Sequence, residues 1–308
     1  RQWEIPRTPD GRPDLQGNWT NQSLTPIQRR AGQEPTYSRD EVAALEQGYV
    51  DRIVRGAQPS DPDRQLPPSQ SSISAADSYN NVYFETGSRV AVVYGEPRTS
   101  LITYPLDGRI PARSPEGQRR REERQDFRSQ FGQYDHPELR PLAERCLTSY
   151  GSPAGPPMLP NGGYNSNYTI VQTPDHVMIM TEMVHDTRII RLGTPEPLPA
   201  HMRPWMGDSW GRWQGDTLVV ETRNFDAKRK WRGTTSSARL VERFTRVDED
   251  TLEYQFTVTD PETWSSSWTA SVPLRLNPEP MFEYACHEGN YSMPIMLGGA
   301  RVEEAAGR

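Results

Sequence analysis

The sequence has little of what would assign a function directly. It holds two cysteines in 308 residues and carries a net charge of −6 at pH 7. No apolar run approaches the roughly 18 residues that a membrane-spanning helix needs. A negative net charge gives no electrostatic footprint for nucleic acid or for an anionic membrane surface. We therefore expect no nucleic-acid partner and no insertion into a membrane.

The common catalytic fingerprints are also missing. The chain has no HExxH or CxxC metal motif, no G-x-S-x-G nucleophile turn, and no phosphate-binding or dinucleotide-binding glycine loop. We therefore expect no cofactor. A metal site is the alternative, and its candidate ligands are Glu182, His185 and His287.

What is present describes a polar, turn-rich chain that still has material for a core. There are 29 prolines and 23 glycines, together with 8 tryptophans and 13 tyrosines, and the mean hydropathy is −0.84. Such a composition is typical of a folded protein with much irregular structure rather than of a disordered one.

The N-terminal part shows no sustained strand pattern. Residues 1–37 are rich in Pro, Gly and Asn, which predicts an extended arm with turns. Ser38 and Glu41 have the spacing of a capping box, and Gly56 follows the last apolar position. A helix is therefore expected from Ser38 to Gly56. We interpret residues 1–75 as an arm plus a helix that packs on the body.

Residues 76–308 are expected to form a β-rich body, with a helical insertion near 114–131. From residue 164 onward, about eight strand-like segments alternate with turn signals and no helix pattern separates them. This organisation predicts a mainly β fold, either an antiparallel barrel or a strongly curved sandwich. The last strand is expected around 281–289, and the whole chain is expected to be one domain.

Three stretches of the chain carry a resemblance to a known group. The texts "PDLQGNWTN", "GDSWGRWQGDTLVVETRNF" and "EYACHEGNY" resemble a widespread family of exported bacterial proteins of unassigned activity. The resemblance implies a cleaved signal peptide and a periplasmic or secreted location. The β-rich half is similar, far more loosely, to the lipocalin-like barrels, which include hydratases of terpenoid chains.

The two cysteines, Cys146 and Cys286, lie far apart in the sequence. One long-range disulfide in an oxidising compartment is the favoured interpretation, and two free buried thiols are the alternative. Cys286 is followed directly by His287 and Glu288. Because consecutive side chains on a strand point to opposite faces, His287 is badly placed to activate Cys286 as a nucleophile.

Titratable groups embedded in aromatic sequence are candidates for proton transfer, because partial burial shifts pKa values toward neutrality. Each has a structural alternative: Asp208 as a turn cap, Arg188 as the ion-pair partner of Glu242, and His185 as a core histidine. The predicted proton carriers are His185, Asp208, His287 and Glu288, with Arg188 as an anion partner.

A concavity lined by aromatic side chains could hold a hydrophobic or aromatic small molecule. The predicted function is an exported enzyme of the lyase, dehydratase, isomerase or hydrolase type acting on such a molecule. One alternative is a non-catalytic binding or assembly protein whose N-terminal arm builds a homo-oligomer, and another is a metal-dependent enzyme using His185 and His287. The predicted ligand-binding residues are Trp205, Trp210, Trp213, Tyr291 and Asn165.

Overall fold

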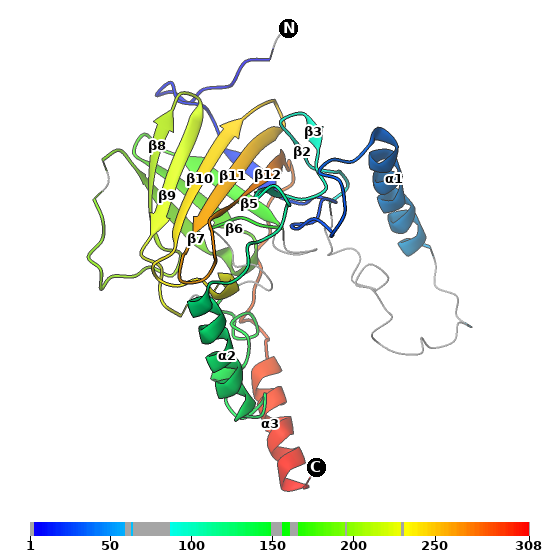
Figure 1. Cartoon of the computed structure of the whole chain (residues 1–308), viewed down its shortest axis with the longest axis vertical. Helices are drawn as coiled ribbons and strands as arrows, with labels where there is room; N and C mark the ends of the chain where they lie inside the picture. Colours follow the sequence, from blue (N-terminus) through cyan, green and yellow to red (C-terminus); the bar gives the residue numbers. More distant parts are fainter. Residues whose placement is uncertain are drawn as a thin grey trace.

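The computed structural model describes residues 3–58, 63, 87–148, 156–160, 166–194, 196–228 and 231–307. Within these residues the fold is mainly β, and nine strands form a closed barrel (Figure 1). The predicted barrel is therefore confirmed. Its strands are β1 (Gly17–Thr20), β5 (Asn167–Gln172), β6 (His176–Thr181), β7 (Thr187–Leu192), β8 (Asp208–Gln214), β9 (Thr217–Arg223), β10 (Arg239–Arg246), β11 (Thr251–Thr259) and β12 (Trp268–Leu276).

The short strand β1 closes the barrel, because it pairs with β5 on one side and with β12 on the other. Trp19 is the register partner of both Tyr168 and Leu276. Residues 1–37 are therefore more than the extended arm that the sequence predicts. One further feature departs from the prediction of an antiparallel sheet: β7 and β8 are parallel, so the chain must cross over between them through residues 193–207.

Strand alternation builds the core. In β11, Tyr254 and Phe256 point inward and are fully buried, whereas Glu253 and Gln255 between them are only partly buried. The indole of Trp268 packs against the ring of Phe256, with 5.5 Å between ring centroids, and against two further tryptophans. Burying each large apolar side chain contributes about 1.5–3 kcal/mol, so the barrel interior is the main source of stability.

A group of three short strands precedes the barrel's main run of strands. It consists of β2 (Val92–Val93), β3 (Glu96–Pro97) and β4 (Ile102–Tyr104). The first two pair with each other, and β4 adds to β12. The N-terminal half thus covers and extends the barrel.

The helix α1 (Arg39–Gly56) is confirmed with its capping box: the Ser38 hydroxyl accepts from the Glu41 N–H, and the Glu41 carboxylate accepts from the Ser38 N–H. None of its described residues is buried, and it stands apart from the barrel in Figure 1. Assembly through the N-terminal arm stays a prediction. None of the described helices is long and apolar enough to cross a membrane.

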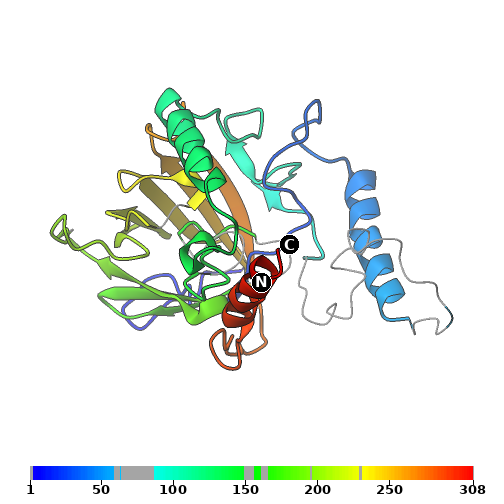
Figure 2. The ribbon, with the colours of Figure 1, turned by 90° about the horizontal axis from the view of Figure 1, so that it is seen from below.

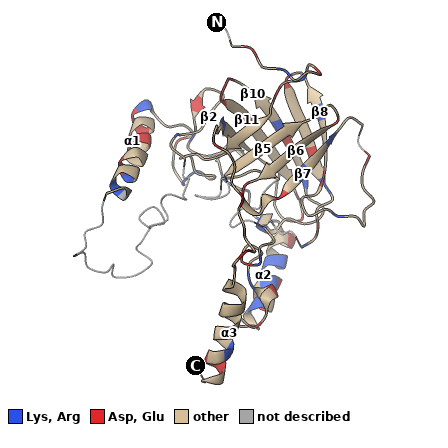
Figure 3. Ribbon diagram, turned by 180° about the vertical axis from the view of Figure 1, so that it is seen from behind, with Lys and Arg blue, Asp and Glu red and all other residues tan. Residues whose placement is uncertain are grey.

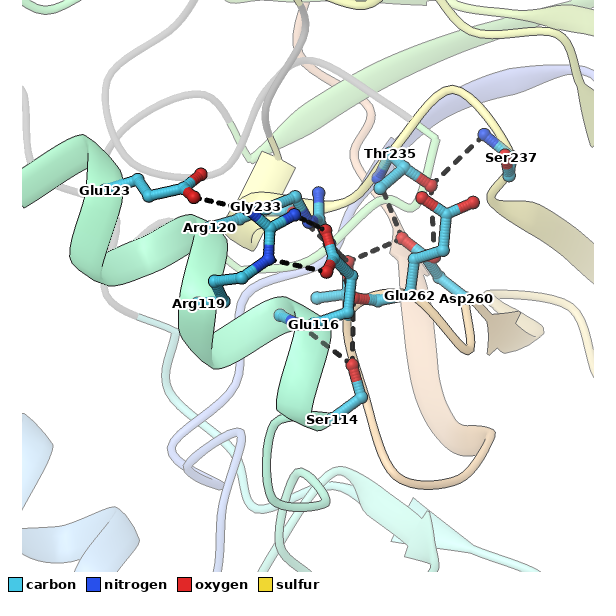
Figure 4. A network of polar contacts seen from close by, with 12 residues as sticks. Ser114, Glu116, Arg119, Arg120, Glu123, Gly233, Thr235, Ser237, Asp260 and Glu262 are labelled. Carbon is cyan, nitrogen blue, oxygen red and sulfur yellow. Dashed lines mark hydrogen bonds and ion pairs between the residues drawn. The ribbon is translucent and has the colours of Figure 1, made fainter.

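The helix α2 (Pro115–Ser129) confirms the predicted helical insertion, and polar contacts fix its start to the barrel (Figure 4). The Ser114 hydroxyl caps the helix by accepting from the Gly117 N–H at 3.0 Å and donates to the Glu262 carbonyl at 2.9 Å. Nearby, the buried Asp260 carboxylate accepts from the hydroxyl of Thr263 at 2.7 Å. These contacts attach the start of α2 to the β11–β12 connection.

The chain after β12 differs from the prediction. The expected strand around 281–289 is absent, and a loop leads instead into α3 (Ser292–Ala305), which the sequence pattern did not indicate. β12 is already paired with β11, β1 and β4, so it offers no edge to the chain that follows it. Figures 1 and 2 show α2 and α3 extending from the same end of the barrel.

The predicted disulfide is confirmed. Cys146 and Cys286 are bonded, with 5.8 Å between their Cα atoms. The side chain of Asn290 also donates to the Cys286 carbonyl at 3.0 Å. The bond ties the loop before α3 to residue 146, rather than tying a last strand as the sequence suggested.

Candidate functional site

A pocket with a volume of about 500 Å³ lies at the β8–β9 hairpin, beside the connection from β7. Figure 1 shows this connection as a long loop beside β8. The residues of the pocket that matter below are Leu198 and Ala200 from the connection, Asp208 and Trp210 from β8, and Glu221 and Arg223 from β9.

Strand alternation places these side chains on the outside of the barrel wall. Ser209 and Thr222 are register partners whose buried hydroxyls bond each other at 2.9 Å on the inner side. The next residues along the two strands point to the other face, so Trp210 and its register partner Glu221 face outward. The parallel pairing of β7 with β8 sends the connection back across this outer face, which encloses the pocket.

Asp208 joins three parts of the site. Its Oδ1 atom lies 2.5 Å from Nη2 of Arg191 on β7, and its Oδ2 atom accepts from the Leu198 N–H at 2.8 Å. The Arg191 guanidinium in turn lies 5.6 Å from the centre of the Trp210 ring. Asp208 is 4 % exposed. It therefore holds the connection against the barrel wall and fixes the cation beside the tryptophan.

The second carboxylate of the pocket, Glu221, is also engaged by arginines. It forms ion pairs with Arg239, at 2.6 Å, and with Arg223. The hydrogen bond from Arg239 is the main reason that the pKa of Glu221 is lowered from its usual value. Glu221 is therefore an anion at neutral pH and a weak base.

The predicted site residues are only partly brought together. Asp208 and Trp210 line the pocket. Trp213 packs against the hydrophobic core instead, and Trp205 lies half-buried in the connection, outside the lining. Asn165 lies outside the described residues.

Arg188 lies inside the barrel, where it forms the structural ion pair with Glu242 instead of facing the pocket as an anion partner. Its Nη1 atom is 2.5 Å from Oε2 of Glu242, and both side chains are almost completely buried. The Tyr254 hydroxyl donates to the same carboxylate at 2.8 Å and accepts from the Met158 N–H at 3.1 Å. Burial, followed by the charge of Glu242, raises the pKa of Tyr254, so the phenol stays protonated and remains a donor.

The remaining candidates are at the surface. His185 is exposed in the turn between β6 and β7. His287 and Glu288 are exposed in the loop before α3, and Tyr291 is 70 % exposed at the start of that helix. None of them lines the β8–β9 pocket.

The candidate metal ligands Glu182, His185 and His287 do not form a metal site. In the part of the chain that the structure describes, no group of three or more His, Cys, Asp and Glu side chains could hold a metal ion. The Glu182 carboxylate instead accepts from the Ser166 N–H and from the Asn167 side chain, each at 3.2 Å.

Sequence reasoning missed Arg191, Leu198, Glu221 and Arg223. A signal for two of them was present, because "TLVVETR" from 217 to 223 alternates and puts Glu221 and Arg223 on the same face of one strand. No comparable signal exists for Leu198 and Arg191, since the contact of Leu198 depends on the crossover and that of Arg191 on the parallel pairing.

Comparison with protein-family models, with curated proteins and with solved structures gives no match. The closed nine-stranded barrel is loosely consistent with lipocalin-like architecture, although its parallel β7–β8 pair departs from a simple up-and-down order. Because one fold serves many functions, the site has to carry the functional argument.

Proposed function

We propose that this chain binds a small molecule with a flat apolar part in the β8–β9 pocket. The observation that carries the proposal is the pocket itself: its volume of about 500 Å³ lies within the range of roughly 300–1,000 Å³ that is common for small-molecule sites. Trp210 supplies a large ring surface, and the connection supplies Leu198.

The charged groups at the pocket support binding with a defined orientation. Arg191 lies beside the Trp210 ring, where a cation and an aromatic face attract each other. Asp208 and Glu221 line the pocket, and each forms an ion pair with an arginine, Asp208 with Arg191 and Glu221 with Arg239. A ligand with a ring and one or two polar substituents fits such a lining.

Binding is better supported than the proton-transfer chemistry predicted from the sequence. A carboxylate in an ion pair is stabilised in its charged form and is a poor proton carrier near neutral pH. Glu221 is paired in this way, and its pKa is lowered. Proton transfer by Asp208 is the second candidate, because Asp208 is the one predicted proton carrier that lines the pocket.

We also infer export to an oxidising compartment. The Cys146–Cys286 disulfide supports this location, because such bonds persist in the periplasm and outside cells and are rare in the cytosol. The resemblance to exported bacterial proteins points the same way.

The test is a fluorescence titration with the neutral aromatic probe N-phenylnaphthylamine. Ala200→Trp places a large ring in the pocket from the exposed connection and removes no described hydrogen bond, so we expect probe affinity to fall at least about tenfold, or 1.4 kcal/mol. Ala227→Trp adds the same ring at an exposed position outside the pocket lining and should leave affinity unchanged. Equal affinity in both variants would refute the pocket as the binding site.

A further inference from the structure

A row of arginines follows one face of α2, outside the β8–β9 pocket. Arg120, Arg124 and Arg128 are spaced four residues apart, so they lie on the same side of the helix. Arg113 lies just before the helix on that side. We call these four residues the arginine cluster; Figure 3 shows blue Lys and Arg segments along α2.

Contacts fix the direction of this face. A Cβ atom on the buried Gly117 would come within 2.4 Å of the Thr263 carbonyl oxygen, so the helix touches the β11–β12 connection there. Arg120 donates to the Glu262 carbonyl at 2.6 Å and to the Thr263 hydroxyl at 3.0 Å (Figure 4). Arg113, Arg120 and Arg124 are half-buried. Arg113 and Arg120, the end of the cluster nearest the barrel, therefore lie in the angle between α2 and the β11–β12 connection.

The carboxylates near this angle already have hydrogen-bond or ion-pair partners. Both oxygens of Glu116 bond Arg119, at 2.9 and 2.6 Å, and Glu116 lies 3.6 Å from Arg120. Asp260 is engaged by Thr263 and by a neighbouring loop. None of the described carboxylates forms an ion pair with Arg113, Arg124 or Arg128.

Among the described residues, the guanidinium groups of Arg113 and Arg128 donate to backbone oxygens, the carbonyls of Arg232 at 3.5 Å and of Leu139 at 3.4 Å. Arg124 has no hydrogen-bond or ion-pair partner among the described residues. Burial, and then the charges of the three other cluster arginines, lower the pKa of Arg124. Arginine nevertheless stays protonated in proteins, so several positive charges remain close together without a counter-charge.

We propose that the arginine cluster binds a phosphate-type oxyanion, either free phosphate or the phosphate or sulfate ester group of a larger molecule. Guanidinium groups offer planar pairs of N–H donors that match the oxygens of phosphate, and such charge-assisted bonds are about twice as strong as neutral ones. A bound anion would supply the missing counter-charge. The site is separate from the β8–β9 pocket and does not depend on the function proposed for it.

The test is isothermal titration calorimetry of the full chain with inorganic phosphate, and then with glycerol phosphate, at constant ionic strength set with chloride. Arg124→Gln removes the unpartnered guanidinium, so we expect affinity to fall about tenfold. Arg121→Gln on the same helix removes an exposed arginine outside the cluster and should change affinity less than about twofold. Vesicles of phosphatidylcholine with and without phosphatidic acid then separate a lipid headgroup from a soluble ester.

A second readout separates anion binding from a purely structural role. In phosphate-free buffer, Arg124→Gln should unfold at the same temperature as the parent chain or higher, because it relieves repulsion. Added phosphate should then raise the unfolding temperature of the parent more than that of the variant. The proposal is overturned if phosphate does not bind, if Arg121→Gln loses as much affinity as Arg124→Gln, or if acetate binds more tightly than phosphate.

Discussion

Two arginines of strand β7 pair with carboxylates on opposite faces of the barrel wall, and the two pairs differ in what surrounds them. Arg188 meets Glu242 in the interior, where both side chains are almost fully buried. Arg191 meets Asp208 on the outer side, where the Arg191 side chain is 34 % exposed and a pocket adjoins the pair. The same chemistry thus stabilises the barrel on the inside and shapes a binding site on the outside.

The largest expected effect is on the inner pair. Glu242→Leu leaves Arg188 as a buried charge without its partner, which should lower the free energy of unfolding by about 3–5 kcal/mol. Urea denaturation measures this loss. The double variant Arg188→Met/Glu242→Leu removes both charges and should recover part of it, although the Tyr254 hydroxyl still loses its acceptor. A loss below about 1 kcal/mol in the single variant would contradict the structural role of the pair.

The disulfide comes next. Replacing Cys146 and Cys286 by serine removes a cross-link spanning 140 residues, and we expect a loss of about 3 kcal/mol in the free energy of unfolding. Because neither cysteine lines the pocket, probe affinity should not change. Denaturation with and without reductant provides the control, since reductant should destabilise the parent chain and leave the variant unaffected.

Breaking the outer pair, Arg191 with Asp208, should lower the free energy of unfolding by less. Asp208→Asn keeps the shape of the side chain but weakens its bonds to Arg191 and to the Leu198 N–H, so we expect a loss of about 1–3 kcal/mol. Unlike the inner substitution, it should also weaken probe binding, because Asp208 holds the connection over the pocket. Urea denaturation and probe titration on the same sample measure the two effects, and weakened stability with unchanged affinity would contradict the role given to Asp208.

The smallest effect concerns Glu221 and pH. Its pKa is lower in the folded chain than in the unfolded one, so its contribution to stability is present above the unfolded value and is lost as the pH falls through the folded value. We expect Glu221→Gln to cost about 0.5–1 kcal/mol at pH 7. The difference from the parent chain should disappear at acidic pH, and a difference that persists there would point to packing rather than charge.

The sequence predicted the elements whose signals are local or periodic. The capping box at Ser38 marked α1, and strand alternation marked a closed β system. It also favoured a Cys146–Cys286 disulfide, and it gave the Arg188–Glu242 ion pair as the alternative to the predicted role of Arg188 as an anion partner. The helix and strand patterns can be predicted because residue spacing alone decides which face a side chain occupies.

The site was less predictable, because its shape depends on how distant segments pair. The parallel register of β7 with β8 decides that the connection returns over β8 and that Arg191 meets Asp208. Likewise, β12 already has its partners in β11, β1 and β4, and His287 and Glu288 lie in a loop instead of on a sheet. Neither outcome can be predicted from the local sequence pattern.

The most direct test of the contrast between the two faces is the dissociation constant of N-phenylnaphthylamine in two variants measured side by side. The account predicts that Arg188→Met/Glu242→Leu binds the probe as the parent chain does, at a temperature where it is folded, whereas Ala200→Trp binds it at least about tenfold more weakly. The opposite result, with affinity lost in the interior variant and kept in Ala200→Trp, would place the ligand inside the barrel and contradict the outer pocket as the site.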